Sequence, residues 1–171
     1  MSQPHTDFIT ALRTLAKTRN YVLNRAWKFD YGQNPSSMGN FYTLLPRDIQ
    51  DSYDEKMYYL IFCVYMKTHD FPSYQGNFGA SLRQLVTQMP IQTGTKIFTH
   101  LLNVSFISRD DHDAYQTLTQ CLRRCFNLMR KYYVRVNYTQ LLKDLLAWID
   151  PNQKVQLAWA RQFYRGVPTV Q

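Results

Sequence analysis

Three clusters in the sequence hold side chains that could do chemistry: spaced cysteines, a run of acids with a histidine, and paired cations. Two of the three cysteines, Cys121 and Cys125, lie four residues apart, with no histidine near them to complete the four ligands of a structural zinc site. An odd number of cysteines also argues against a framework of disulfides. We therefore predict no metal or redox site, and we expect Cys63 and Cys125 to be small buried side chains.

The string "RDDHD" at residues 109–113 holds the carboxylates and the imidazole that a divalent metal could bind. It directly precedes a predicted helix, however, where aspartate is favoured as an N-cap and beside the positive end of the helix dipole. We favour this structural role for Asp110, Asp111 and Asp113. A metal nuclease that uses these acids together with His112 is the alternative. The sequence contains no Walker loop, GxSxG or GxGxxG motif, so we predict no catalytic residue and no cofactor.

The stretch "TLTQCLRRCFNLMRKYY" at residues 117–133 carries two pairs of adjacent cations, Arg123–Arg124 and Arg130–Lys131, and no acid. A helix here has one apolar stripe, made of residues spaced three or four apart: Tyr115, Leu118, Leu122, Cys125, Met129 and Tyr132. The cation pairs are seven residues apart, so they lie off this stripe as two rows of like charge. A helix that only packs on a core normally adds Glu for pairing four residues away, and this one does not. We therefore predict that its basic face binds an anion.

Charge is segregated along the whole chain, whose formal net charge is +8. Acids are absent from residues 13–28, 71–109 and 114–143. Such segregation favours a polyanionic partner, and it adds Arg25 and Lys28 to the candidate nucleic-acid-binding residues. The alternative is a basic protein whose charge only keeps it soluble.

Several aromatic residues lie between cations, where they could stack on nucleic-acid bases. They are Tyr21, Trp27, Tyr132, Tyr133, Tyr138 and Tyr164. Packing in or near the core is the commoner role for each of them. Tyr74 is the better stacking candidate, because it lies in a predicted loop close to Gly76.

Helical periodicity dominates the sequence, and its 6 Gly and 7 Pro are few for a turn-rich β-protein. One helix is predicted to begin at Asp7 with Thr6 as its cap, and Asp54 is predicted to cap another. The remaining helical stretches are 19–27, 55–69, 78–89, 95–103, 112–133, 138–149 and 153–164. The turn-rich "GQNPSSMGN" (32–40) and the stretch from Pro90 to Gly94 are predicted breaks.

The expected fold is all-α, with about eight helices in two packed helical bundles. The predicted boundary lies within the second break, so that the bundles comprise residues 1–92 and 93–171. Residues 132–138 show the one local β-like alternation. No apolar run approaches the roughly 20 residues needed to span a bilayer, and the N-terminus lacks the pattern of a signal peptide. We therefore expect a soluble, cytoplasmic protein with no membrane partner.

Several short motifs occur in an order that resembles the CasB family, the small subunit of the type I-E CRISPR surveillance complex Cascade. These are "YVLNRAW" (21–27), "FYTLLP" (41–46), "YLIFCVYM" (59–66), "GASLRQL" (79–85), "KIFTHLL" (96–102) and "LRRCF" (122–126), with "LLAWI" and "ARQFY" near the end. No single motif is specific. The ordered set, in a chain of this length and charge, carries the resemblance over about residues 8–164.

The resemblance implies a non-catalytic protein of two helical bundles that acts in antiviral defence. It implies pairing with a second copy and contacts with the backbone and large subunits of Cascade. It also implies binding to CRISPR guide RNA and target DNA, which stabilises the guide–target hybrid and the displaced strand of the R-loop.

Position by position, Arg25, Arg123 and Arg124 match basic positions of the family's nucleic-acid-facing surface, and Lys154 does so loosely. Such a subunit needs only to neutralise phosphates, because guide pairing reads the sequence. The alternative function is a helical protein-interaction adaptor whose basic faces meet acidic protein partners.

Overall fold

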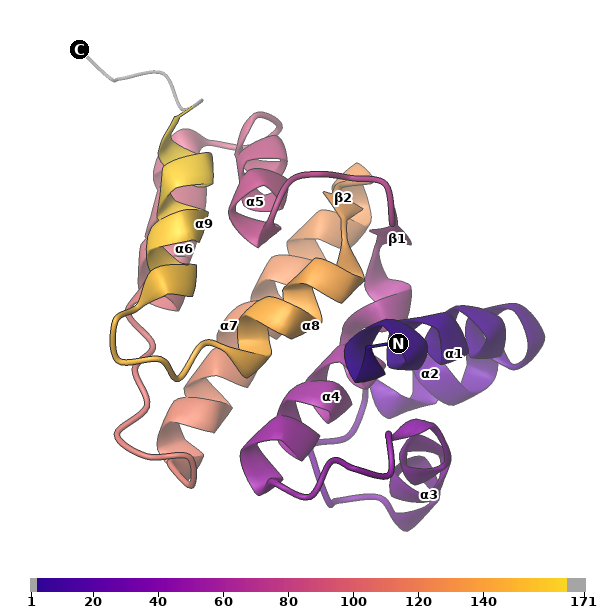
Figure 1. Cartoon of the computed structure of the whole chain (residues 1–171). Coiled ribbons are helices and arrows are strands. Elements are labelled where there is room, and N and C mark those ends of the chain that lie inside the picture. The colour runs from indigo at the N-terminus through magenta and orange to yellow at the C-terminus, as the bar shows by residue number, and fades with distance from the viewer. Residues whose placement is uncertain (1–2, 166–171) are drawn as a thin grey trace. The chain divides into compact units, whose positions relative to one another are not determined.

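The chain folds into two compact units, Met1–Met66 and Lys67–Gln171, in a computed structural model that describes residues 3–165. Within the described residues the secondary structure comprises nine α-helices, a short 3₁₀ turn and one two-stranded sheet (Figure 1). The predicted all-α class is therefore confirmed. None of the helices in the described part of the chain is long and apolar enough to cross a membrane.

The first unit is built around one helix that is buried over most of its length. Its elements are α1 (Pro4–Thr18), α2 (Asn20–Ala26), α3 (Pro35–Leu44) and α4 (Ser52–Val64). Every side chain from Met57 to Val64 is buried, as the apolar circumference of this stretch predicts. Phe8 of α1 packs edge to face on Tyr58 of α4, with ring centroids 4.9 Å apart. Such aromatic pairs add to the burial that holds the short helices together.

Two helix starts in the first unit differ from the predicted ones. α1 begins at Pro4 rather than after Thr6, because proline at the first helical position has a suitable φ and no N–H to satisfy. α4 is capped by Asp51 rather than Asp54, and the Asp51 carboxylate accepts hydrogen bonds from two N–H groups of the first turn. Asp54 instead lies in that turn, where its negative charge interacts favourably with the positive end of the helix dipole.

The turn-rich stretch at residues 32–40 is largely helical, contrary to prediction. Asn34 is the N-cap of α3, and its side chain accepts a hydrogen bond from the N–H of Ser37. Pro35 follows at the first helical position. The same residue types that occur in turns therefore start a helix here. Phe41 of this helix is fully buried, and its burial favours the helix over a turn.

The second unit holds the sheet and the remaining helices. Its elements are β1 (His69–Asp70), α5 (Phe78–Val86), α6 (Ile91–Leu102), α7 (His112–Tyr132), β2 (Arg135–Val136), α8 (Tyr138–Leu146) and α9 (Lys154–Tyr164). The core is aromatic: the Trp159 ring lies 4.9 Å from Trp148 and 5.1 Å from Phe78. β1 and β2 pair in parallel, so the β-like alternation at residues 132–138 contributes one short strand.

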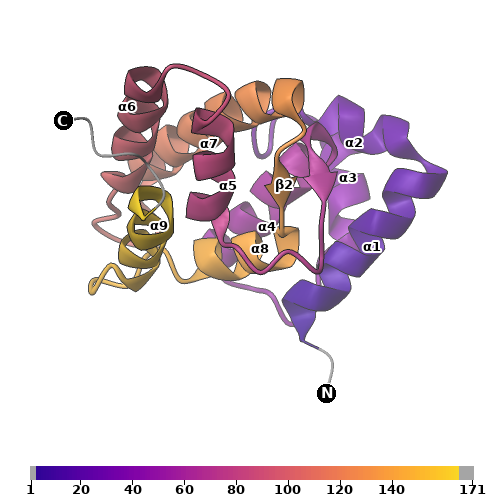
Figure 2. The same ribbon diagram turned by 90° about the horizontal axis from the view of Figure 1, so that it is seen from above.

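The boundary between the compact units follows Met66, whereas the sequence predicts it after residue 92. The difference arises because α5 packs more extensively on α9 than on any other element (Figure 2). Gly79 permits this close approach, since a Cβ atom there would collide with the backbone carbonyl of Trp159. α5 therefore belongs with the C-terminal helices.

Pro90 and Gly94 do not form a break. Pro90 is the N-cap of α6, which begins at the next residue. Gly94 lies inside α6, buried where the helix passes Val86 of α5. Proline and glycine are both typical of turns, so the sequence predicts a turn here. In the structure Pro90 precedes a helix and Gly94 lies at a contact between two helices.

Candidate nucleic-acid interface

The helices α6 and α7 pack against each other (Figure 2). A groove runs along the seam between them. It consists of two adjoining hollows of about 540 Å³ and 410 Å³, which share Ile97 and Arg124. We call this seam the α6–α7 groove. Its cationic side chains are Lys96 from α6 and Arg123 and Arg124 from α7, joined by the imidazole of His100.

The α6 wall follows from the amphipathic pattern of that helix. Ile97, Phe98 and Leu101 are buried, whereas Lys96 and His100 are exposed, one helical turn apart. Lys96 and His100 were not among the predicted binding residues. Their four-residue spacing on the polar face, inside an acid-free stretch, is the signal that could have identified them.

The α7 wall is organised as the sequence predicts. Leu118, Leu122 and Cys125 of the apolar stripe are at most 1% exposed, and Tyr132 at its end is half-buried. Arg124 is exposed on the opposite side, and Arg123 is half-buried at the groove.

The N-cap of α7 is Asp111, which confirms the structural role predicted for this acid. One carboxylate oxygen accepts a hydrogen bond of 3.0 Å from the N–H of Ala114. The other accepts one of 3.0 Å from the N–H of Ile107, in the preceding loop. These bonds to the charged form hold the pKa of Asp111 below its ordinary value.

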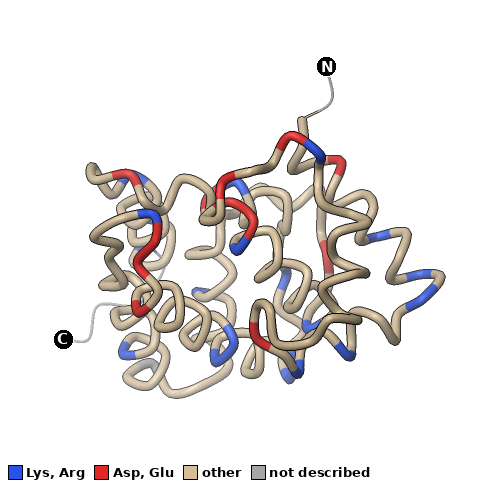
Figure 3. Tube along the Cα trace, turned by 90° about the horizontal axis from the view of Figure 1, so that it is seen from below, with Lys and Arg blue, Asp and Glu red and all other residues tan. Residues whose placement is uncertain are grey.

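No carboxylate lines the α6–α7 groove among the described residues. Acids are absent from all of α6, and from α7 after Asp113. Figure 3 marks the cations in blue and the acids in red along the chain trace. Like charges along both walls make a favourable site for a polyanion, because the clustered cations raise the local potential.

Three other predicted cations of the second unit lie outside the two hollows. Arg130 and Lys131 are exposed in the last turn of α7, two turns beyond Arg123 and Arg124. They extend the row of positive charge along the same helix. Lys154 is exposed at the first residue of α9 and does not line the groove.

The predicted cations of the first unit, Arg25 and Lys28, are both exposed. The N–H of Lys28 donates to the carbonyl of Arg25 at 3.1 Å, so the helical turn continues past the end of α2. The two side chains are therefore neighbours on one face of that turn.

All three cysteines are buried, which confirms the prediction for Cys63 and Cys125. Burial raises the pKa of Cys125 to about 12 and also raises the pKa of Cys121, at the floor of the groove, above its usual value. Both side chains are therefore neutral thiols at physiological pH. Among the described residues, no group of three His, Cys, Asp or Glu is arranged to hold a metal ion.

The aromatic stacking candidates differ widely in exposure. Tyr138 is fully buried, and Tyr74 is half-buried with its ring against Gly76 and its hydroxyl accepting from Gln84 at 3.0 Å. Tyr133 is 76% exposed and Tyr21 is 65% exposed. The loop position of Tyr74 is thus a packed one, and the most exposed ring lies directly after α7.

A family model described as CRISPR-associated protein Cse2 matches residues 22–164. The chain therefore belongs to the Cse2 family of CRISPR-associated proteins. Within that class, the resemblance to the CasB-family small subunit of Cascade is confirmed.

Solved structures share the fold. CasB from M. ruber superposes with a TM-score of 0.73 at 22% identity, over 96% of this chain and 94% of that chain. A CRISPR-associated protein of the Cse2 family from Thermus thermophilus also gives 0.73, at 23% identity, over 96% of this chain and 99% of that chain. A structure described as CasB from Thermus thermophilus gives 0.71 at 23% identity, with the same coverage. No curated protein sequence matches the chain.

Proposed function

We propose that this chain is a non-catalytic small subunit of Cascade that holds nucleic acid by its phosphate backbone, without preference for sequence. In this role it stabilises the guide–target hybrid and the displaced strand of the R-loop, alongside a second copy of itself and the backbone and large subunits. Membership of the Cse2 family supports the assembly. The cations of the α6–α7 groove support nucleic acid as the ligand.

The proposal of a phosphate ligand depends on one observation, the absence of a carboxylate from the described lining of the groove. Arginine suits such a site, because its planar guanidinium can hold a phosphate through two hydrogen bonds. Arg124 lines both hollows, and Lys96 faces it from α6. Contacts to phosphates carry no sequence information, which fits a subunit that leaves sequence recognition to guide pairing.

A binding titration with single-stranded DNA tests the proposal. The double variant Arg123→Ala/Arg124→Ala should bind two unrelated DNA sequences more weakly by the same factor, because phosphate contacts carry no base information. Its salt slope, d log K/d log [salt], should be less steep by about 1.4, since each lost phosphate contact removes about 0.7. The titration is read by fluorescence anisotropy at several salt concentrations.

The matched control is Lys143→Ala/Arg161→Ala. It removes the same charge from exposed positions on α8 and α9 that do not line the groove, and it should keep most of the affinity. If both double variants lost affinity equally, binding would depend on the net charge of the chain and not on the groove. A wild-type chain that binds no nucleic acid would instead favour the adaptor whose basic faces meet acidic proteins.

A further inference from the structure

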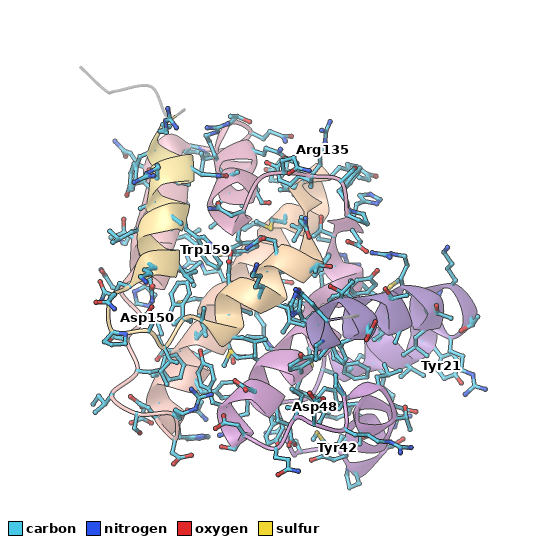
Figure 4. All side chains as sticks on the ribbon, in the orientation of Figure 1. Tyr21, Tyr42, Asp48, Arg135, Asp150 and Trp159 are labelled. Atoms are coloured by element: carbon cyan, nitrogen blue, oxygen red, sulfur yellow. The ribbon has the colours of Figure 1, made fainter. Side chains whose placement is uncertain are left out.

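The short sheet of the second unit has an outward face made of rings and a cation. β1 and β2 are parallel, with His69 beside Arg135. Phe71 and Tyr133 lie just outside the two strands, and both of their rings contact the ring of His69. We call these four residues the strand platform. Figure 4 labels Arg135 at this face.

The opposite side of the two strands is packed into the unit. Val134 and Val136, which alternate with the platform residues, are each 1% exposed. Asp70, the one acid in these strands, pairs in register with Val136 and therefore lies on this inner side. The platform thus has a rigid apolar base and carries no carboxylate of its own.

The platform rings are already arranged for stacking. The His69 and Tyr133 rings stack with centroids 5.5 Å apart and planes 18° apart. His69 also meets Phe71 edge to face at 6.1 Å. The Arg135 guanidinium lies 5.7 Å from the centre of the Phe71 ring. These contacts fix the orientation of Tyr133, yet 76% of this residue remains exposed.

Tyr133 has a backbone conformation that opposes its residue type. It ends α7 in the left-handed region, with φ of 52°, where glycine is the usual residue. A bulky side chain in this region is uncommon and costs free energy. A large ring that is strained and yet exposed contributes little to the core, so its presence at this position points to a ligand.

The surroundings of the ring favour an anionic ligand. Arg130 and Lys131 lie in the turn just before it, and residues 114–143 contain no acid. A partner that presents flat rings and negative charge together is single-stranded nucleic acid, whose bases stack on aromatic side chains while cations bind its phosphates. An acidic protein surface supplies the charge but not the repeated flat faces.

We propose that the strand platform stacks one base of a single strand on the Tyr133 ring, which His69 supports from behind. Arg130, Lys131 and Arg135 supply cations for the neighbouring phosphates. The proposal rests on the proposed function and deepens it. It adds a base-stacking site, indifferent to base identity, to a subunit that otherwise binds only the backbone.

The test compares Tyr133→Asn with Tyr133→Phe in the full chain. Asparagine tolerates the left-handed conformation, so Tyr133→Asn removes the ring without a backbone penalty, and its melting temperature should not fall. The ligands are a fluorescent oligothymidylate and an abasic strand of the same length. Tyr133→Asn should weaken thymidylate binding by about 5- to 150-fold, since stacking contributes about 1–3 kcal/mol per base. Binding of the abasic strand should not change.

Tyr133→Phe should bind both strands as the wild type does, because the ring remains. Equal thymidylate binding by the wild type and Tyr133→Asn would overturn the stacking site and leave backbone binding standing. Equal losses on both strands would overturn it too, because the effect would not depend on bases. A wild-type chain that binds neither strand would overturn the proposed function as well. Unchanged DNA binding, with loss of co-purification with the other subunits, would reassign the platform to a protein partner.

Discussion

At the scale of single residues, Asp111 connects α7 to the loop before it. Its carboxylate holds N–H groups on both sides of the helix start, Ala114 within α7 and Ile107 in the loop. We predict that Asp111→Ala lowers the melting temperature by about 2–4 °C, the typical effect of losing an N-cap in a chain of this size. Circular dichroism measures this change.

Asp111→Asn is the matched control, because asparagine caps helices as well as aspartate does. It should melt close to the wild type at neutral pH. The pKa of Asp111 is lowered in the fold, so the charge contributes stability above the unfolded pKa and loses it as pH falls through the folded value. Equal melting of the Ala and Asn variants would show that Asp111 does not act as a cap.

Asp144 behaves in the opposite way. It is a largely buried carboxylate on α8 that accepts hydrogen bonds of 2.7 Å from Trp159 of α9 and from Gln140. Burial raises its pKa above the ordinary value, although both hydrogen bonds oppose the shift. Figure 4 labels Trp159, the partner that ties α9 to this site.

We therefore predict that the Asp144 carboxyl favours the folded state most at acidic pH. A raised folded pKa contributes stability that is fully present below the unfolded pKa and is lost as pH rises through the folded value. The free energy of unfolding of the wild type, relative to Asp144→Asn, should increase from pH 7 towards pH 4. Urea titrations at both pH values measure it, and a difference that stays constant with pH would contradict the shifted pKa.

At the scale of elements, the pairing of α5 with α9 depends on one residue without a side chain. We predict that Gly79→Ala destabilises the second unit by about 1–3 kcal/mol, because the new methyl group meets the backbone of Trp159, which cannot rotate away. Urea denaturation followed by tryptophan fluorescence measures it in a Trp27→Phe background, so that the signal comes from Trp148 and Trp159 of this unit alone.

Gly39→Ala is the control for that change. Gly39 is exposed inside α3, and a Cβ atom there meets nothing within 4 Å. The substitution should be neutral or stabilising, by up to about 1 kcal/mol, because alanine loses less backbone entropy than glycine in a helix. If both variants had the same stability, the close approach of α5 and α9 would not limit the size of residue 79.

At the scale of the whole molecule, binding should depend strongly on salt. The α6–α7 groove and the end of α7 supply five cations to one strand, namely Lys96, Arg123, Arg124, Arg130 and Lys131. We expect about three to five phosphates to be engaged, which gives a slope of about −2 to −3.5 for log K against log [salt]. Fluorescence anisotropy across a salt series measures this slope.

Isolated binding should then be weak at physiological salt and become effective when the rest of the complex holds the strand nearby and raises its effective concentration. A flat salt response would mean that stacking on rings such as Tyr133 dominates, and the electrostatic account of the groove would be wrong.

The sequence by itself determined most of the helices, the basic face of α7 and the capping of that helix by an aspartate. The predicted stretch at residues 112–133 differs from α7 by one residue, because periodicity, capping and charge are properties of neighbouring residues. The resemblance to the CasB family also rests on the order of local motifs. The unpredicted helix α3 and the misplaced start of α6 show the limit of local signals, because asparagine, proline and glycine occur at helix ends and in turns alike.

Only the tertiary structure decided which segments meet. It placed Lys96 and His100 opposite Arg124 and assigned α5 to the second unit. It also paired His69 with Arg135, which brought Tyr133 onto an exposed face. These contacts join residues far apart in the chain, and they depend on how apolar faces and small residues fit together in three dimensions. A single sequence carries no periodic signal for such packing. The residues that the packing brings together at the binding surface are therefore found only in the folded structure.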